Sequence, residues 1–98
     1  MKTILNYSPN FETKKRKYKQ IKFLIFHYTG MKNESTAISR LTNIKSKVSS
    51  HYLIKNNGEI ITFVPDLYIA WHAGISFWKN FELLNKNSIG IEISNPGH

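Results

Sequence analysis

Short apolar runs separated by polar turns predict most of the secondary structure of this chain. Residues 22–28 are almost wholly apolar and rich in aromatic and branched side chains, which predicts a strand buried on both faces in the centre of a sheet. Residues 51–54 and 59–64 predict two more strands, and the Asn57-Gly58 pair between them is a strong hairpin signal. Residues 88–93 predict a last strand.

One segment, residues 33–44, has the pattern of an amphipathic helix. Asn33 or Ser35 can cap its start, and Glu34 suits its first turn. Its apolar residues fall on one helical face, namely Ala37, Ile38, Leu41 and Ile44. Residues 1–20 are predicted to be a polar lead-in. Residues 67–87 are predicted to be an ordered loop with a short helical turn near 81–84.

The order strand, helix, hairpin, loop, strand predicts an α/β fold. We expect a mixed β-sheet with one packed helix, in a single domain that spans residues 1–98. Sheets of this type are usually covered on both faces. Because the chain offers only one good helix, either one face is bare or a covering element lies beyond residue 98.

Composition narrows the possible chemistry. The chain is 41% hydrophobic and 13% aromatic, which is typical of a globular protein. It has no cysteine, so disulfides and thiolate ligands are excluded, and a metal site must use His, Asp or Glu. The longest apolar run, residues 23–26, is too short to span a membrane, and the N-terminus lacks a signal-like stretch. We therefore expect no membrane span and a cytoplasmic location.

The net charge of +8 favours an anionic partner. Residues 14–22 carry much of this charge and are interpreted as a solvated basic loop. A nucleic-acid-binding domain is one hypothesis, but it rests on charge alone, since no aromatic residues are interleaved as in an RNA-binding sheet. We expect no nucleic-acid partner.

Two residues stand out as candidates for chemistry. His27 ends the first predicted strand, where it could be a metal ligand or general base, or a core histidine satisfied by backbone hydrogen bonds. Glu92 lies within an apolar strand and points to the same side as Gly90, which leaves empty space beside it. Glu92 could face a cleft and polarise a water, or it could face solvent on an edge strand.

The segment around residues 70–74 holds further candidates. His72 could hydrogen-bond a substrate while Trp71 or Trp78 stacks on a sugar or peptide, or the tryptophans could simply fill the core of the loop. His51, at the start of a predicted strand, is interpreted as structural.

Several of these segments, in this order, resemble a known family. They are residues 26–31 (FHYTGM), 48–54 (VSSHYLI), 58–60 (GEI), 70–76 (AWHAGIS), 88–93 (SIGIEI) with Asn85, and 95–98 (NPGH). The sequence is similar to the type-2 N-acetylmuramoyl-L-alanine amidases, which share their fold with T7 lysozyme and the peptidoglycan recognition proteins. The resemblance runs from about residue 6 to the end of the chain.

The resemblance implies roles for the candidate residues. His27 matches a zinc ligand, Glu92 matches the carboxylate that activates water, and His72 and Trp71 match a loop beside the substrate groove. The implied function is zinc-dependent hydrolysis of the amide between N-acetylmuramic acid and L-alanine, in peptidoglycan or muropeptides, by a monomer. We expect His27 and Glu92 to face a shared groove.

The chain departs from the family pattern in one respect. The family's second histidine ligand and its third ligand, an Asp or Cys, have no counterpart, so the remaining Zn²⁺ ligands are expected beyond residue 98. We therefore interpret the sequence as a C-terminally truncated amidase-2 fold that is inactive or nearly so alone. The alternative is a non-catalytic module that binds peptidoglycan or muropeptides.

Overall fold

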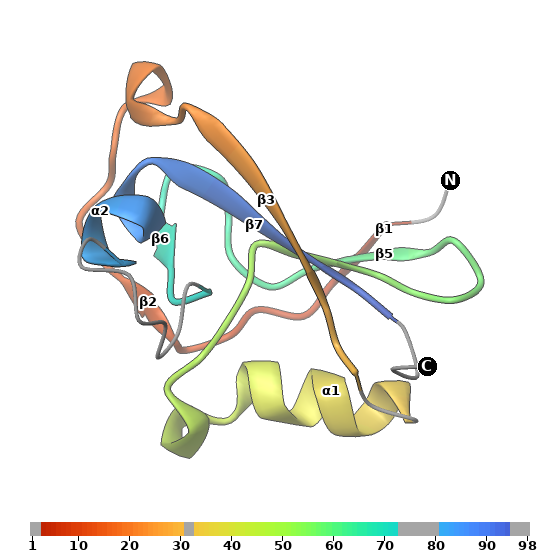
Figure 1. Ribbon diagram of the computed structural model, residues 1–98. Coiled ribbons are helices and arrows are strands. Elements are labelled where there is room, and N and C mark those ends of the chain that lie inside the picture. The colour runs from red at the N-terminus through yellow and green to blue at the C-terminus, as the bar shows by residue number, and fades with distance from the viewer. Residues whose placement is uncertain (1–2, 31–32, 73–80, 95–98) are drawn as a thin grey trace.

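The structure is a computed structural model that describes residues 3–30, 33–72 and 81–94. Its main feature is a five-stranded sheet in the order β1-β5-β4-β7-β3 (Figure 1). The strands are β1 (Thr3–Leu5), β3 (Phe23–Tyr28), β4 (Tyr52–Ile54), β5 (Ile60–Thr62) and β7 (Ser88–Ile93). β7 runs parallel to β3 and β4, and β1 runs parallel to β5, whereas β4 and β5 are antiparallel. The predicted mixed sheet is confirmed.

The other elements are short and lie around this sheet. They are the helices α1 (Glu34–Thr42) and α2 (Phe81–Lys86), the small antiparallel sheet of β2 (Phe11–Glu12) and β6 (Ile69–Ala70), and the 3₁₀ turns η1 (Tyr18–Gln20) and η2 (Ile44–Ser46). Among the described residues, no helix is long and apolar enough to cross a membrane.

The helix and the hairpin form as predicted, with small shifts. The Asn33 side chain caps α1 by accepting a hydrogen bond from the backbone N–H of Ser35 at 2.9 Å. The helix ends at Thr42, so Ile44 falls in η2 and is 66% exposed, which shows that its placement on the apolar helix face was wrong. In the hairpin turn, Gly58 has a φ of +87°, a conformation that glycine adopts readily.

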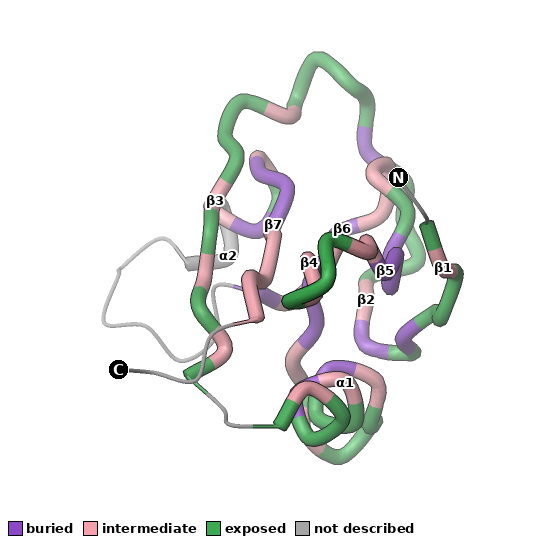
Figure 2. Tube along the Cα trace, turned by 90° about the vertical axis from the view of Figure 1, so that its right-hand side faces the viewer, coloured by how far each residue is buried: buried purple, intermediate pink, exposed green. Residues whose placement is uncertain are grey.

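The core lies on one face of the main sheet, beneath α1. It joins Leu41 of α1 to Leu53 and Ile61 of the sheet, together with Phe63, Val64 and Ala70. The opposite face is open over β3, where Leu24, Phe26 and Tyr28 are 62%, 53% and 67% exposed. Figure 2 shows β3 as a mostly exposed strand at the edge of the sheet. Among the described elements, none covers this face of β3, and the two alternatives for this face, bare or covered by an element beyond residue 98, stay open.

The prediction that residues 22–28 form a central, doubly buried strand is wrong. β3 is the edge strand and pairs only with β7 among the described strands. The apolar run that suggested burial is real, but half of its side chains point to the open face, where no described element covers them.

The prediction of a polar lead-in at residues 1–20 is also wrong in part. β1 and β2 are only two or three residues long, and each pairs with a distant segment. The local sequence therefore did not identify them as strands. The intervening Ser8 and Asn10 are buried, and their side chains donate to the carbonyls of Leu41 at 2.6 Å and Asn43 at 2.9 Å. In the predicted loop at 67–87, the structure has β6 and α2, while residues 73–80 lie outside the described residues.

Candidate active site

His27 and Glu92 lie side by side on one face of the main sheet. β3 and β7 are parallel, and their register pairs His27 with Glu92. The next strand, β4, places Leu53 beside Glu92. Side chains at paired positions point to the same face, and neighbouring strands are about 4.8 Å apart. Because Leu53 belongs to the core, His27 and Glu92 face the covered side of the sheet. A groove shared by the two side chains stays a prediction.

Glu92 is a largely buried carboxylate with an oxygen that has no partner. Its Oε2 atom is buried and makes no hydrogen bond in the structure. Burial raises the pKa of Glu92, and the positive charge of Arg40 works against that rise. The carboxylate lines a pocket of about 70 Å³ together with Tyr28, Thr29, Ala37, Arg40 and Leu41. An acid of raised pKa in such a pocket can exchange a proton with a small molecule such as water.

His72 is held against His27 from the core side. The Nε2 atom of His27 is 3.1 Å from Nδ1 of His72, and Nε2 of His72 is 2.8 Å from the hydroxyl of Ser88. His72 is only 8% exposed, and burial lowers its pKa to about 3, helped by the nearby His27, His51 and Arg16. Burial also lowers the pKa of His27. Both imidazoles are therefore neutral at pH 7.

The space above Gly90 is filled rather than empty. A Cβ atom at Gly90 would lie 2.3 Å from Cγ of His72, so glycine is needed because the imidazole rests directly on the strand. The sequence interpretation that Gly90 opens a cleft beside Glu92 is therefore wrong. Gly90 makes room for His72, and the pocket at Glu92 is on the side of α1 instead.

His51 and Arg16 form a buried structural cluster next to this group. Nδ1 of His51 accepts from the backbone N–H of Gly90 at 3.0 Å, and its Nε2 donates to the carbonyl of Tyr68 at 2.8 Å. Burial lowers the pKa of His51 to about 4. The interpretation of His51 as structural agrees with these contacts.

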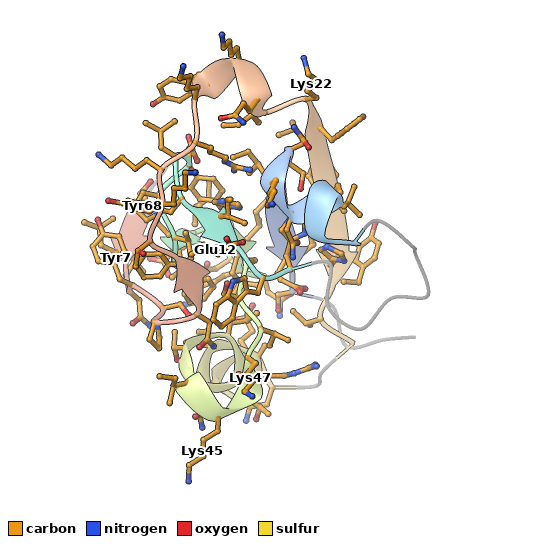
Figure 3. The ribbon with its side chains drawn as sticks, turned by 90° about the vertical axis from the view of Figure 1, so that its left-hand side faces the viewer. Tyr7, Glu12, Lys22, Lys45, Lys47 and Tyr68 are labelled. Atoms are coloured by element: carbon orange, nitrogen blue, oxygen red, sulfur yellow. The ribbon has the colours of Figure 1, made fainter. Side chains whose placement is uncertain are left out.

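Arg16 is a buried residue that sequence analysis missed. It is 5% exposed, and its guanidinium donates to the carbonyls of Asp66, Asn85 and Lys86 at 2.9–3.0 Å. The basic segment was predicted to be a solvated loop, which holds for its exposed lysines, and Figure 3 shows Lys22 pointing away from the body of the protein. The only available signal was residue type, since the chain has just two arginines and a planar guanidinium suits several carbonyls at once.

Trp71 lies next to His72 in the chain and is partly exposed. Its backbone carbonyl accepts from the N–H of Ser49 at 2.9 Å, and its own N–H donates to the Ser49 hydroxyl at 3.0 Å. Backbone hydrogen bonds to Ser49 therefore hold this segment in place, and the Trp71 indole takes no part in them. The assignment of Trp71 and His72 to substrate binding stays a prediction, and Trp78 lies outside the described residues.

The fold and this arrangement agree with comparisons to known proteins. The chain belongs to the N-acetylmuramoyl-L-alanine amidase family Amidase_2, whose family model matches residues 17–98. It is similar to the N-acetylmuramoyl-L-alanine amidase AmiD of Escherichia coli K12, with 44% identity over 87 residues, covering 82% of this chain and 30% of AmiD. It is also similar to the 1,6-anhydro-N-acetylmuramyl-L-alanine amidase AmpD of Citrobacter freundii, with 49% identity over 47 residues, covering 48% of this chain and 25% of AmpD.

Solved structures show the same relationship. One is E. coli AmiD in complex with the substrate anhydro-N-acetylmuramic acid-L-Ala-D-γ-Glu-L-Lys, which matches with a TM-score of 0.63 and 38% identity over 88% of this chain and 35% of that chain. Another is AmpDh3 of Pseudomonas aeruginosa with anhydromuramic pentapeptide, with a TM-score of 0.61 and 31% identity over 90% of this chain and 38% of that chain. The part of each of these relatives that this chain matches is between 25% and 38% of its length.

The side chains present fit only part of a zinc site. Neutral imidazole is a common zinc ligand, and burial favours that form of His27. The unpaired Oε2 of Glu92 suits a group that handles water or an ion. Within residues 3–30, 33–72 and 81–94, however, no group of three or more potential ligands is placed to hold a metal. Zinc sites need three or four ligands, so the described residues cannot complete one.

Proposed function

We propose that this chain supplies His27 and Glu92 to the active site of a zinc-dependent N-acetylmuramoyl-L-alanine amidase. Such an enzyme hydrolyses the amide bond between N-acetylmuramic acid and L-alanine in peptidoglycan or muropeptides. The observation that carries the proposal is the pairing of an imidazole with a largely buried carboxylate, one oxygen of which has no hydrogen-bond partner, on one sheet face. Membership of the family and the muropeptide complexes of its relatives support the choice of substrate.

In this proposal His27 is one zinc ligand, and the remaining ligands come from outside the described residues. Zinc at such a site would polarise the amide carbonyl and make a water more acidic. Glu92 accepts the proton of the attacking water, a task for which burial raises its pKa toward the operating range. The positive charge of Arg40 opposes that rise in the pKa of Glu92. Trp71 contributes an aromatic surface beside the substrate.

Because the described residues hold too few ligands, we propose that the 98-residue chain alone has little or no activity. The monomeric state and the cytoplasmic location stay predictions from the sequence. An alternative function, supported by the same shortage of ligands, is a module that binds muropeptides without cleaving them.

The two functions are separated by incubating the protein with an anhydro-muropeptide and following peptide release by chromatography, with and without zinc. Under the amidase proposal, zinc binding is weak but depends on His27, and any peptide release stops with a chelator or with Glu92→Gln. Glu12→Gln, an exposed carboxylate, is the matched control. Tight muropeptide binding that neither a chelator nor His27→Ala alters would instead support the binding module. Cleavage that survives Glu92→Gln would overturn the catalytic role of Glu92.

A further inference from the structure

A chain of hydrogen bonds runs from the end of α2 to His27. The Ser88 hydroxyl lies 2.5 Å from the carbonyl oxygen of Leu84. Nε2 of His72 lies 2.8 Å from the same hydroxyl, and Nδ1 of His72 lies 3.1 Å from Nε2 of His27. Four groups on three segments are therefore joined in one line that ends at the candidate zinc ligand.

The position of each proton in this chain follows from its first member. A carbonyl oxygen can only accept, so the single hydroxyl proton of Ser88 is donated to Leu84. The Ser88 oxygen must then accept from Nε2–H of His72. His72 is 8% exposed and its two ring nitrogens meet an imidazole and a hydroxyl rather than a carboxylate, so the buried ring carries no charge and has only one N–H. Nδ1 of His72 is therefore an acceptor and takes its hydrogen bond from Nε2–H of His27. His27 is left with a bare lone pair on Nδ1.

The rings in this chain cannot easily turn to another arrangement. His72 rests on Gly90, where its Cγ would be 2.3 Å from a Cβ atom, so the strand backbone blocks one side of the ring. The ring of His51 lies 6.1 Å from that of His72, and the two hydrogen bonds of His51 to Gly90 and Tyr68 hold it there. The hydrogen-bond order is thus fixed by packing as well as by donor and acceptor type.

We propose that Ser88 and His72 are positioning residues, which place the ring proton of His27 on Nε2 and so keep its Nδ1 lone pair free for a metal ion. The metal-binding role of His27 in this inference rests on the proposed function, whereas the order of the protons rests only on the hydrogen bonds. The free nitrogen of a metal-binding histidine is generally set by the hydrogen bond that its other nitrogen makes. The sequence suggested that His72 contacts substrate, whereas the structure assigns both of its ring nitrogens to protein partners.

Nitrogen NMR reads the tautomers directly. Long-range ¹H–¹⁵N correlation spectra of the labelled protein, at pH 7.5 with a chelator, should show a pyrrole-like Nε2 and a pyridine-like Nδ1 for His27 and His72. Ser88→Ala removes the acceptor at the start of the chain, so both histidines should shift toward the opposite tautomer. Ser88→Thr keeps a hydroxyl and should restore the wild-type pattern. Ser50→Ala, which removes a buried hydroxyl that bonds to Tyr52 instead, should change neither.

Zinc binding provides the second measurement. Zinc titration followed by the His27 resonances should show an affinity about 10-fold lower in Ser88→Ala than in wild type or Ser88→Thr. Should Ser88→Ala fail to fold, Ser88→Cys serves in its place. Because a thiol is a weak acceptor, the tautomers of both histidines should shift in the same direction as in Ser88→Ala.

The outcomes separate this inference from the proposed function. A wild-type His27 protonated on Nδ1, or tautomers and zinc affinity unchanged in Ser88→Ala, would overturn the positioning role and leave the amidase proposal standing. If zinc did not affect the His27 resonances of the wild-type protein, both the proposed metal role of His27 and the proposal that Ser88 and His72 prepare it for a metal would be contradicted. The tautomers would still test the order of the protons.

Discussion

The two faces of the main sheet invert the usual arrangement of a half-exposed sheet. On β3 and β7, polar side chains such as His27, Ser88 and Glu92 point to the covered face, while Leu24 and Phe26 point to the open one. Half-exposed sheets normally place apolar residues inside and polar residues outside. The apolar core beneath α1 is supplied mainly by the neighbouring hairpin, through Leu53, Ile61 and the residues that follow.

Within this one sheet, the hairpin supplies most of the apolar core, whereas β3 and β7 supply the candidate catalytic side chains. The covered side of β3 and β7 contains His27 and Ser88, which are both hydrogen-bonded to His72, and Glu92, whose Oε2 has no partner. On β3 the open side contains large side chains that contact solvent, whereas Ile89 of β7, on the same side, is only 6% exposed. Changes to the hydrogen-bonded groups of the covered side should therefore lower stability, and changes to the exposed side chains of β3 should be nearly neutral.

Acidification should have the largest effect, and it acts mainly through the buried histidines. The pKa values of His51 and His72 fall to about 4 and about 3 in the folded protein, against about 6.5 when unfolded. As the pH falls below 6.5, these histidines become protonated in the unfolded chain but stay neutral in the folded protein. The free energy of unfolding therefore decreases. At pH 5 we expect a loss of about 2 kcal/mol for each of these histidines relative to pH 7.5. Protonation of Glu92, whose pKa is raised, offsets part of this loss.

Urea unfolding of the chelator-treated protein at several pH values measures this loss. The ring C–H resonances of His51 and His72 should not titrate between pH 7.5 and 5. A free energy of unfolding that stays constant over this range would contradict the neutral, buried state of both rings.

Gly90→Val should destabilise the protein by about 3 kcal/mol, because the new side chain must displace His72 from the strand. Strand propensity alone would predict that Gly90→Val raises stability, because valine is favoured over glycine in strands. The expected change in stability has the opposite sign. Ile91→Val, one residue along and facing the open side, is the control and should change stability by about 0.5 kcal/mol. Chemical denaturation followed by circular dichroism distinguishes them, and equal midpoints for the two variants would contradict the steric role of Gly90.

The covered and open faces also differ in how far the sequence could predict them. The hairpin, the capped helix and the last strand follow local rules, so they were found within one or two residues. The pairing of His27 with Glu92 depends on strand order, and the sequence supported it through the family resemblance rather than through any local pattern. The edge position of β3 could not be predicted, since an apolar run looks the same whether or not a neighbour covers it.

The roles of single polar residues were the hardest to predict. Arg16, Ser88 and His72 act through partners that are distant in the chain or that depend on ring orientation. The sequence shows a basic run, a small residue at a strand start and a histidine beside a tryptophan, and none of these patterns specifies a hydrogen bond. The sequence drew attention to Gly90 but gave it the wrong role, because the side chain that fills the space above it, His72, could be identified only from the structure.

Glu92→Gln should raise stability slightly while removing the proposed base. A neutral amide avoids placing a charge in the covered face, where burial raises the pKa of the carboxyl. We expect a gain of about 1 kcal/mol at pH 7.5. The gain should shrink as the pH falls toward the raised pKa, because the wild-type carboxyl then becomes neutral as well. Thermal unfolding at pH 7.5 and pH 5, beside the exposed control Glu12→Gln, tests this, and a less stable Glu92→Gln at pH 7.5 would contradict it.

Phe26→Thr should have the smallest effect, since it changes only the open face. Phe26 is 53% exposed, and threonine suits an exposed strand position, so we expect a change in stability of about 0.5 kcal/mol or less.

Removing one aromatic ring from the exposed group formed with Leu24 and Tyr28 should also reduce binding of an apolar fluorescent dye such as ANS. Dye fluorescence and the unfolding midpoint are measured together, with Leu53→Ala as the contrasting variant on the covered face, where the loss should be about 3 kcal/mol. A loss at Phe26 as large as that at Leu53 would show that the outer face is packed against something, and the contrast between the two faces would fail.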